Sequence, residues 1–193
     1  MSRNIKSLEG LENWTQLEYL NIDQTNLKRI DQLKGLINLR QLNIQYNPIR
    51  TIEALSGLTS LLCLNLSNNK LVGQSLSPLG YMINMTILDL SGNEEISNID
   101  PLRNMKNLIQ LDVSYNCIEN IEVLQNLENL ELLHLYQNLI QTCEPLKYLT
   151  KLETLDITSN FIQDFSSLTH HKYFKQYKLA NQKEYFSKYQ YVD

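Results

Sequence analysis

One pattern, Leu-x-x-Leu-x-Leu-x-x-Asn-x-Ile, returns seven times along this chain. The repeats begin at Leu17, Leu39, Leu61, Met85, Leu108, Leu130 and Leu152. Most are 22 residues long, and the third and fourth are 24 and 23 residues long. Self-similarity at such a period is typical of solenoids, in which each repeat forms one coil that buries its apolar side only by stacking on its neighbours. This pattern therefore constrains the fold more than any other feature.

The residue types within a repeat predict the course of each coil. Counting from the first Leu, positions 4 and 6 are apolar, which suits a short strand with alternate side chains pointing inward. Positions 11, 14, 17 and 20 are apolar at a spacing of three, which suits a tight helical or 3₁₀ return. Position 9 is Asn in six repeats, and an amide can both donate to and accept from the backbone where the strand ends. We expect one stacked column of Asn47, Asn69, Asn93, Asn116, Asn138 and Asn160.

The extra residues of the two long repeats need a place in this scheme. They lie near Gly73–Ser77 in the third repeat and near Glu94–Glu95 in the fourth. Because the strand positions keep their pattern in both repeats, we expect the extra residues to bulge on the return side. The strands should then stay aligned.

Degraded coils close both ends of the array, as a solenoid requires to keep its core from water. An incomplete first coil has apolar residues at positions 11, 14, 17 and 20, namely Ile5, Leu8, Leu11 and Trp14. We expect the bulky Trp14 to cover the first full coil. Phe174, Tyr177 and Leu179 occupy positions 1, 4 and 6 of an eighth coil.

The continuous repeats and the incomplete coils at both ends predict a single domain with three parts. Residues 1–16 form an N-terminal half-coil cap, residues 17–173 form seven repeats, and residues 174–193 form the degraded eighth repeat with a C-terminal cap. We interpret the aromatic segment 183–193 as the outer layer of that cap. A membrane-binding helix is the alternative interpretation of this segment.

Composition and motifs exclude several classes of function. The sequence has no phosphate-binding glycine motif, paired-His metal motif or Cys-x-x-Cys, so we expect no enzyme, no catalytic residues, no cofactor and no metal. No stretch approaches the ~18 apolar residues of a membrane span. Three cysteines within the array and a start without an apolar leader favour a cytoplasmic location. A secreted or surface location would follow if a signal peptide precedes the sequence given.

The 22-residue coil with Ile at positions 11 and 14 resembles one class of leucine-rich-repeat proteins. This class includes the leucine-rich regulatory subunit of protein phosphatase 1, related adaptors and the bacterial internalins. The stretch Ile96-Ser-Asn-Ile-Asp-Pro-Leu-Arg-Asn-Met-Lys-Asn-Leu looks internalin-like. The resemblance implies an α/β fold, a right-handed solenoid with a curved parallel sheet on its concave face and short helical or 3₁₀ segments on its convex face. Because members share the scaffold and little else, it implies no particular function.

Positions 2, 3, 5, 7 and 8 should face outward on the concave side, where solenoids usually bind partners. In the seven repeats these positions hold seven acids, Glu18, Asp23, Asp89, Asp112, Glu131, Glu153 and Asp156, and one base, Arg40. Seven minus one gives a net charge of −6, against −4 for the whole chain. Lys175 and Lys178 of the eighth coil would offset part of it. Nucleic acid needs a basic surface, so the acidic face predicts a protein partner with a basic patch.

Apolar and tyrosine side chains stand among these acids. Leu62, Cys63, Ile87, Ile109 and Leu132 should form one patch across repeats three to six, with Tyr115 and Tyr136 at its edge. Exposed apolar and Tyr residues rimmed by charge indicate an interface. The alternative is that positions 2 and 3 partly pack against each other. The candidate partner-binding residues are Tyr19, Tyr46, Leu62, Ile87, Asp89, Ile109, Asp112, Tyr115, Leu132, His134, Tyr136 and Asp156.

His134 should stand in column 5 between Asp112 and Asp156, on the neighbouring strands. Two nearby carboxylates would favour the protonated imidazole and raise the pKa of His134. A metal ion held by these three residues is the alternative, although one His with two carboxylates makes an incomplete site.

Taken together, these features predict a non-catalytic interaction module that is monomeric alone and binds a protein through its concave face. Two alternatives follow from the resemblance. One is a regulatory or targeting subunit of an enzyme such as a phosphatase, and the other is an internalin-like secreted or surface adhesion protein.

Overall fold

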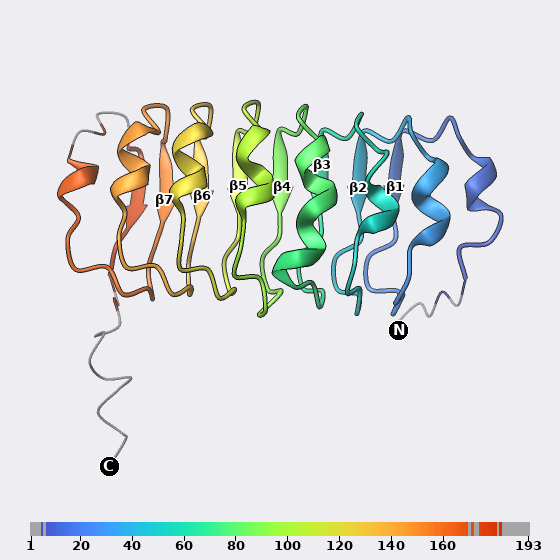
Figure 1. The fold of residues 1–193 in the computed structure, drawn as a ribbon, viewed down its shortest axis with the longest axis horizontal. Helices are drawn as coiled ribbons and strands as arrows, with labels where there is room; N and C mark the ends of the chain where they lie inside the picture. Colours follow the sequence, from blue (N-terminus) through green and yellow to red (C-terminus); the bar gives the residue numbers. More distant parts are fainter. Residues whose placement is uncertain (1–4, 6, 170, 172–173, 181, 183–193) are drawn as a thin grey trace, which may run out of the picture.

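The computed structural model describes residues 5, 7–169, 171, 174–180 and 182, and it shows one solenoid of stacked coils (Figure 1). Within these residues eight parallel strands form a single sheet in chain order. They are β1 Tyr19–Asn21, β2 Gln41–Asn43, β3 Cys63–Asn65, β4 Ile87–Asp89, β5 Gln110–Asp112, β6 Leu132–His134, β7 Thr154–Asp156 and β8 Gln176–Lys178. Neighbouring strands pair position by position, from Leu20 with Leu42 to Leu155 with Tyr177. The predicted strands and their register are confirmed.

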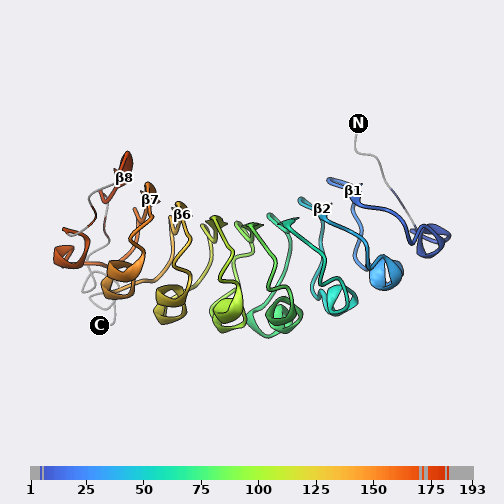
Figure 2. The ribbon, with the colours of Figure 1, turned by 90° about the horizontal axis from the view of Figure 1, so that it is seen from above.

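Each coil returns through a 3₁₀ helix, as the apolar spacing of three predicts. These helices are η1 Leu11–Asn13, η2 Asp31–Gly35, η3 Glu53–Leu55, η4 Gly73–Tyr81, η5 Asp100–Asn104, η6 Glu122–Asn126, η7 Glu144–Tyr148 and η8 Ser166–Leu168. Figure 2 shows the strands on the inner side of a shallow arc and the 3₁₀ helices on the outer side. In the described part of the chain no helix is long and apolar enough to cross a membrane.

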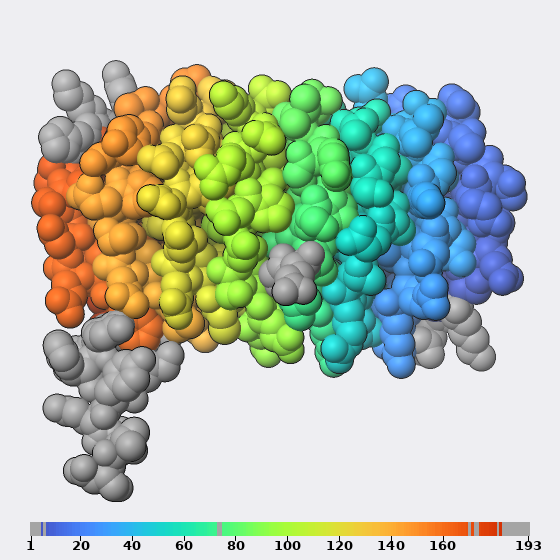
Figure 3. Space-filling view, viewed as in Figure 1, coloured from blue at the N-terminus to red at the C-terminus, as the bar shows by residue number. Residues whose placement is uncertain are grey.

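The core lies between the sheet and the 3₁₀ helices and runs the length of the molecule, and the space-filling view shows the coils packed against one another in chain order (Figure 3). From the second to the seventh coil the inward strand positions are no more than 2% exposed, for example Leu64 and Leu133. The return positions are buried as fully, for example Leu58 and Leu127. Cys143 takes the place of an aliphatic residue and is buried. Burying each such aliphatic side chain contributes about 1.5–3 kcal/mol, so the array is stabilised by many equal increments.

The Asn column at position 9 lies buried where each strand ends, as predicted. Asn138 is representative: its Nδ2 donates to the carbonyls of Val113 and Leu135 at 2.9 and 3.1 Å. Its Oδ1 accepts from the backbone N–H of Ile118 at 3.0 Å. Each amide thus joins its own coil to the preceding one and satisfies backbone groups that the turn would leave unpaired.

The two long repeats are neighbours, and their extra residues lie outside the strands. The extra residues of the third repeat form part of η4. A parallel bridge joins Val72 of this repeat to Glu95 of the fourth repeat. β3, β4 and β5 keep their register across this region, as expected. One bond of the Asn column is lost there, because the buried Oδ1 of Asn116 has no hydrogen-bond partner.

The ends differ from the expectation in one respect. Leu8 is buried and η1 follows it, so the half coil exists, but 62% of the Trp14 side chain is exposed. Trp14 therefore covers the first coil less than its size suggested, because no further coil stacks on its outer side among the described residues. At the other end, Gln182 takes position 9 of the eighth coil and donates through Nε2 to the carbonyl of Ile157 at 2.9 Å. The predicted outer layer, 183–193, lies outside the described residues.

Candidate partner-binding face

The inner face of the sheet presents positions 3 and 5 of every coil. Position 3 is the more exposed, with 57% of Tyr19 and 40% of Ile87 accessible and Leu132 half-buried. Position 5 forms one column in register, in which His134 pairs with Asp112 on one side and Asp156 on the other. The predicted juxtaposition of these three residues is therefore present.

The Asn and Asp residues of column 5 share a local role that was not foreseen. The side-chain Oδ1 of each accepts a hydrogen bond from the backbone N–H two residues later, at 2.9 Å from Asp89 to Ser91 and 2.8 Å from Asp112 to Ser114. Such Asx turns are a general property of these side chains. Each Asp thereby keeps only its second oxygen for other partners.

Position 7 was expected to face outward, but it is less exposed than predicted because of the Asx turns. Three of the residues at this position, Ser67, Ser114 and Thr158, are buried. The Ser67 and Thr158 hydroxyls donate to the column-5 side chains of their own coils. Positions 7 and 5 thus pack together, and these three hydroxyls do not belong to the accessible face.

Ion pairs neutralise much of the predicted acidity. Glu153 pairs with Lys175 at 2.7 Å, and Asp156 pairs with Lys178 at 3.1 Å. At the other end Arg40 lies 3.6 Å from Glu18. With Lys175 and Lys178 of the eighth coil included, seven acids minus three bases give −4 on this face, not −6. The remaining acids without a cationic or imidazole partner among the described residues are Asp23, Asp89 and Glu131.

The His134 imidazole contacts one of its two neighbouring carboxylates. Nδ1 lies 3.3 Å from Oδ2 of Asp112, whereas Asp156 binds Lys178 instead. The hydrogen bond with Asp112 raises the pKa of His134 above its ordinary value, against the opposing effect of burial. Burial raises the pKa of Asp112, but hydrogen bonds from His134 and Ser114 outweigh it and leave that pKa lowered. With the Asp156 carboxylate occupied by Lys178, the geometry gives the alternative of a three-ligand metal site no support.

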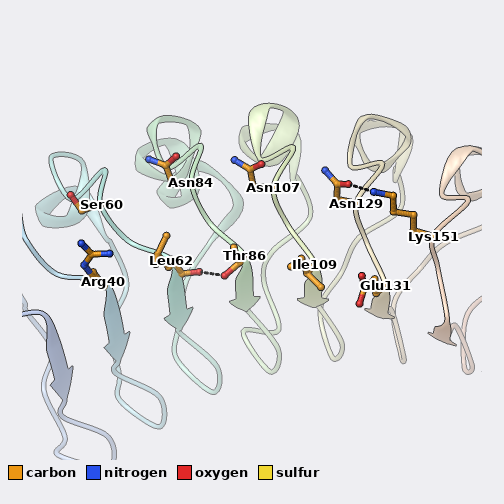
Figure 4. A pocket seen from close by; sticks show the side chains of 10 residues that line it. All are labelled: Arg40, Ser60, Leu62, Asn84, Thr86, Asn107, Ile109, Asn129, Glu131 and Lys151. Carbon is orange, nitrogen blue, oxygen red and sulfur yellow. Dashed lines mark hydrogen bonds between the residues drawn. The ribbon is translucent and has the colours of Figure 1, made fainter.

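Two neighbouring hollows divide the predicted apolar patch. A hollow of about 420 Å³ on the strand face contains Cys63, Ile87 and Leu132 together with Asp89 and His134; we call it the strand-face hollow. A groove of about 660 Å³ follows the edge where the chain enters the strands, and it contains Leu62 and Ile109 (Figure 4); we call it the edge groove. Position 2 thus faces the groove and position 3 faces the hollow, so the apolar side chains are shared between two neighbouring hollows.

A second asparagine ladder lines the edge groove. Asn84, Asn107 and Asn129 precede the first residue of their repeats, and the Nδ2 of each donates to a backbone carbonyl of the preceding coil. Figure 4 shows their amides in a row, with Lys151 bonded to the amide of Asn129 at 2.6 Å. Sequence reasoning missed this ladder, although the recurrence of Asn before position 1 was a readable signal.

Tyrosines lie along the opposite edge, where the chain leaves the strands. The Tyr115 and Tyr136 rings meet edge to face with centroids 4.9 Å apart. Tyr46 and Tyr115 both occupy position 8, where the backbone is left-handed with φ of 53° and 55°. Gly and Asn adopt this conformation most easily, and Gly92 and Asn68 occupy position 8 of two other coils. The two tyrosines, about half exposed, are held there at a cost in backbone energy.

The stacked register, the Asn column and the open strand face define a repeat solenoid whose side chains are displayed on a fixed sheet. A family model described as "Leucine Rich repeats (2 copies)" matches residues 83–126 and 128–170, and one described as "Leucine rich repeat" matches residues 15–71. The chain belongs to the leucine-rich-repeat family. No curated protein matches the sequence.

Solved structures of several organisms share the fold. An internalin of Listeria monocytogenes is 29% identical with a TM-score of 0.78, and the match covers 95% of this chain and 60% of the internalin. A leucine-rich-repeat protein of Leptospira interrogans is 24% identical with a TM-score of 0.84, covering 90% of this chain and 45% of the other. A plant peptide hormone receptor, solved in complex with RGF2, is 21% identical with a TM-score of 0.77, covering 88% of this chain and 29% of the receptor. This chain thus spans only part of these proteins.

Proposed function

We propose that this protein is a non-catalytic interaction module, located in the cytoplasm, that binds a protein partner through the concave face. The observation that carries the proposal is the accessibility of Ile87, of the half-buried Leu132 and of the Tyr115–Tyr136 pair on a sheet whose inward-pointing apolar side chains are almost completely buried from the second to the seventh coil. Apolar and aromatic side chains of this kind, surrounded by polar groups, are the usual anchors of protein interfaces.

The rigidity of the sheet supports this proposal. Ile87 and Leu132 stand on three-residue strands that are bonded to neighbours on both sides, and Tyr115 and Tyr136 lie shortly after β5 and β6, where the Asn column holds the end of each strand. A preorganised surface loses little conformational entropy on binding, so a modest number of contacts suffices for specific recognition. A partner with a basic patch would fit the remaining net charge of the face.

The test compares partner capture by matched variants. Immobilised wild-type protein is exposed to lysate of its own organism, and the captured partner is then titrated against Leu132→Ala and Tyr136→Ala. We expect each variant to weaken binding by about 1–3 kcal/mol with little loss of stability. Tyr148→Ala is the control, because Tyr148 is 51% exposed on the convex side and should bind as wild type does. Equal binding by all three variants would place the site elsewhere.

An internalin-like adhesion function is the second candidate, favoured by the similarity to one internalin of Listeria monocytogenes over 95% of this chain. In this case the protein would be exported and its partner would be displayed by another cell. Locating the native protein by fractionation and surface labelling separates this candidate from the cytoplasmic module.

A further inference from the structure

Asp89 differs from the other carboxylates of column 5 in lacking a positive or imidazole partner. The second oxygen of Asp112 contacts His134, and that of Asp156 binds Lys178. The strand register places Asn65 and Asp112 beside Asp89, and neither supplies a positive charge. The hydrogen bonds from Ser91, one from its N–H and one from its hydroxyl, both reach Oδ1 of Asp89. Oδ2 is left without a cation among the described residues.

We infer that the partner inserts one basic side chain, an arginine or a lysine, into the strand-face hollow, with its charged end on Asp89 and its methylene groups on Ile87. This inference rests on the proposed function and names the chemistry that the concave face recognises.

The electrostatics of the site favour a cation at this point. Asp89 is half-buried, and burial raises its pKa, to which the charge of Asp112 adds, and together they outweigh the hydrogen bonds from Ser91 and Ser67 that lower it. Both effects penalise the carboxylate while no cation is present. A guanidinium or ammonium group at Oδ2 would relieve both, and it would replace lost hydration with a charge-assisted hydrogen bond.

The shape of the hollow fits the stem of such a side chain. Ile87 lies two residues before Asp89 on the same face of β4, and its side chain is 40% exposed. Cys63 and Gln110 flank Ile87 in register on β3 and β5. Long basic side chains commonly lay their methylene groups on apolar surface and place the charge at a polar end. Arginine is the better fit, because its planar guanidinium can donate two parallel hydrogen bonds to one carboxylate.

The test uses small probes, so it does not depend on the identity of the partner. N-acetyl-arginine-amide is titrated into isotope-labelled protein at low salt, and N-acetyl-citrulline-amide, which has nearly the same shape and no charge, is titrated in parallel. We expect backbone amide shifts centred on β3, β4 and β5, with the arginine probe binding at least tenfold more tightly than the citrulline probe.

Asp89→Asn is the decisive variant because it should fold normally. Asn65 and Asn43 make the same Asx bond in the same column, so Asn at 89 keeps the bond to Ser91 and loses only the charge. We expect this variant to abolish the preference for arginine. Asp23→Asn removes another unpaired acid of the face and should leave the preference unchanged. Equal binding of both probes, or an unchanged titration with Asp89→Asn, would overturn the inference.

Partner capture separates this inference from the function on which it rests. If Leu132→Ala and Tyr136→Ala lose the partner while Asp89→Asn retains it at full affinity, the concave face is the site and the basic anchor is wrong. If the concave variants keep the partner, the proposed function fails. Loss of the partner with Asp89→Asn, together with the arginine preference, supports both.

Discussion

At the scale of single residues, position 8 combines a backbone conformation that favours Gly or Asn with side chains that suit a binding surface. The backbone there is left-handed in every full coil, yet two coils place tyrosine at this position. A side chain with a Cβ costs roughly 1–2 kcal/mol in this conformation unless it is Asn or Asp. The backbone conformation of the two tyrosines is therefore unfavourable for folding. Their presence at this position agrees with a role of their rings at the surface.

Tyr46→Asn should raise the free energy of unfolding by about 0.5–1 kcal/mol, because Asn tolerates the left-handed backbone and the half-exposed ring is not part of the core. Tyr115→Asn should gain less, since it also loses the ring contact with Tyr136. Urea denaturation measures both. A clear loss of stability with Tyr46→Asn would mean that its ring packs more usefully than its exposure indicates.

The His134–Asp112 pair should make stability depend on pH on both sides of neutrality. The folded pKa of His134 is raised, so its contribution is complete below the unfolded value of about 6.5 and is lost as pH rises through the folded pKa. The folded pKa of Asp112 is lowered, so its contribution is complete above about 3.9 and is lost as pH falls through the folded pKa.

Titration of the His134 ring by NMR checks this prediction. The pKa should lie above the ordinary value in the wild type and should fall in Asp112→Asn, which keeps the bond to Ser114 but loses the charge. Asp156→Asn should change it less, because Lys178 already neutralises that carboxylate. A wild-type pKa at or below the ordinary histidine value would refute the effect.

At the scale of the coil, the Asn column offers a comparison within one molecule. Asn138 and Asn116 donate equivalent hydrogen bonds through Nδ2, but only Asn138 also accepts one through Oδ1. We expect Asn138→Ala to cost about 2–4 kcal/mol, and Asn116→Ala to cost about 1 kcal/mol less. Denaturation of the two variants under the same conditions measures the difference. Equal losses would show that the Oδ1 bond contributes nothing.

The coil is also the level at which the sequence was most informative. Strand register, the Asn column, the 3₁₀ returns and the eighth strand all followed from periodicity, because each apolar position has one burial environment repeated in every coil. Side-chain pairing did not follow. The bonds of Asp156 to Lys178 and of Asp89 to Ser91 depend on which oxygen faces which neighbour, and spacing alone does not encode this. Trp14 was misjudged because, in the part of the chain that the structure describes, no coil covers its outer side.

At the scale of the whole molecule, stability should be a sum of coils and of contacts between adjacent coils. Gln182→Ala removes the amide that accepts from Ile162 and donates to the carbonyls of Ile157 and Leu179. We expect a loss of about 1–2 kcal/mol that stays at the C-terminal end. Hydrogen exchange should quicken at Ile162 and in β7 but not in β2 or β3. Uniformly faster exchange would indicate that the array unfolds only as one unit.

The bridge between Val72 and Glu95 bears on how the sequence of such a molecule can evolve. Two adjacent repeats of unequal length meet on the outer side, while the strands beside them keep their register. Insertions there do not alter which side chains stand next to one another on the inner face. The outer surface can therefore gain or lose residues while recognition is preserved, and the inner face can acquire new specificity without any change of length.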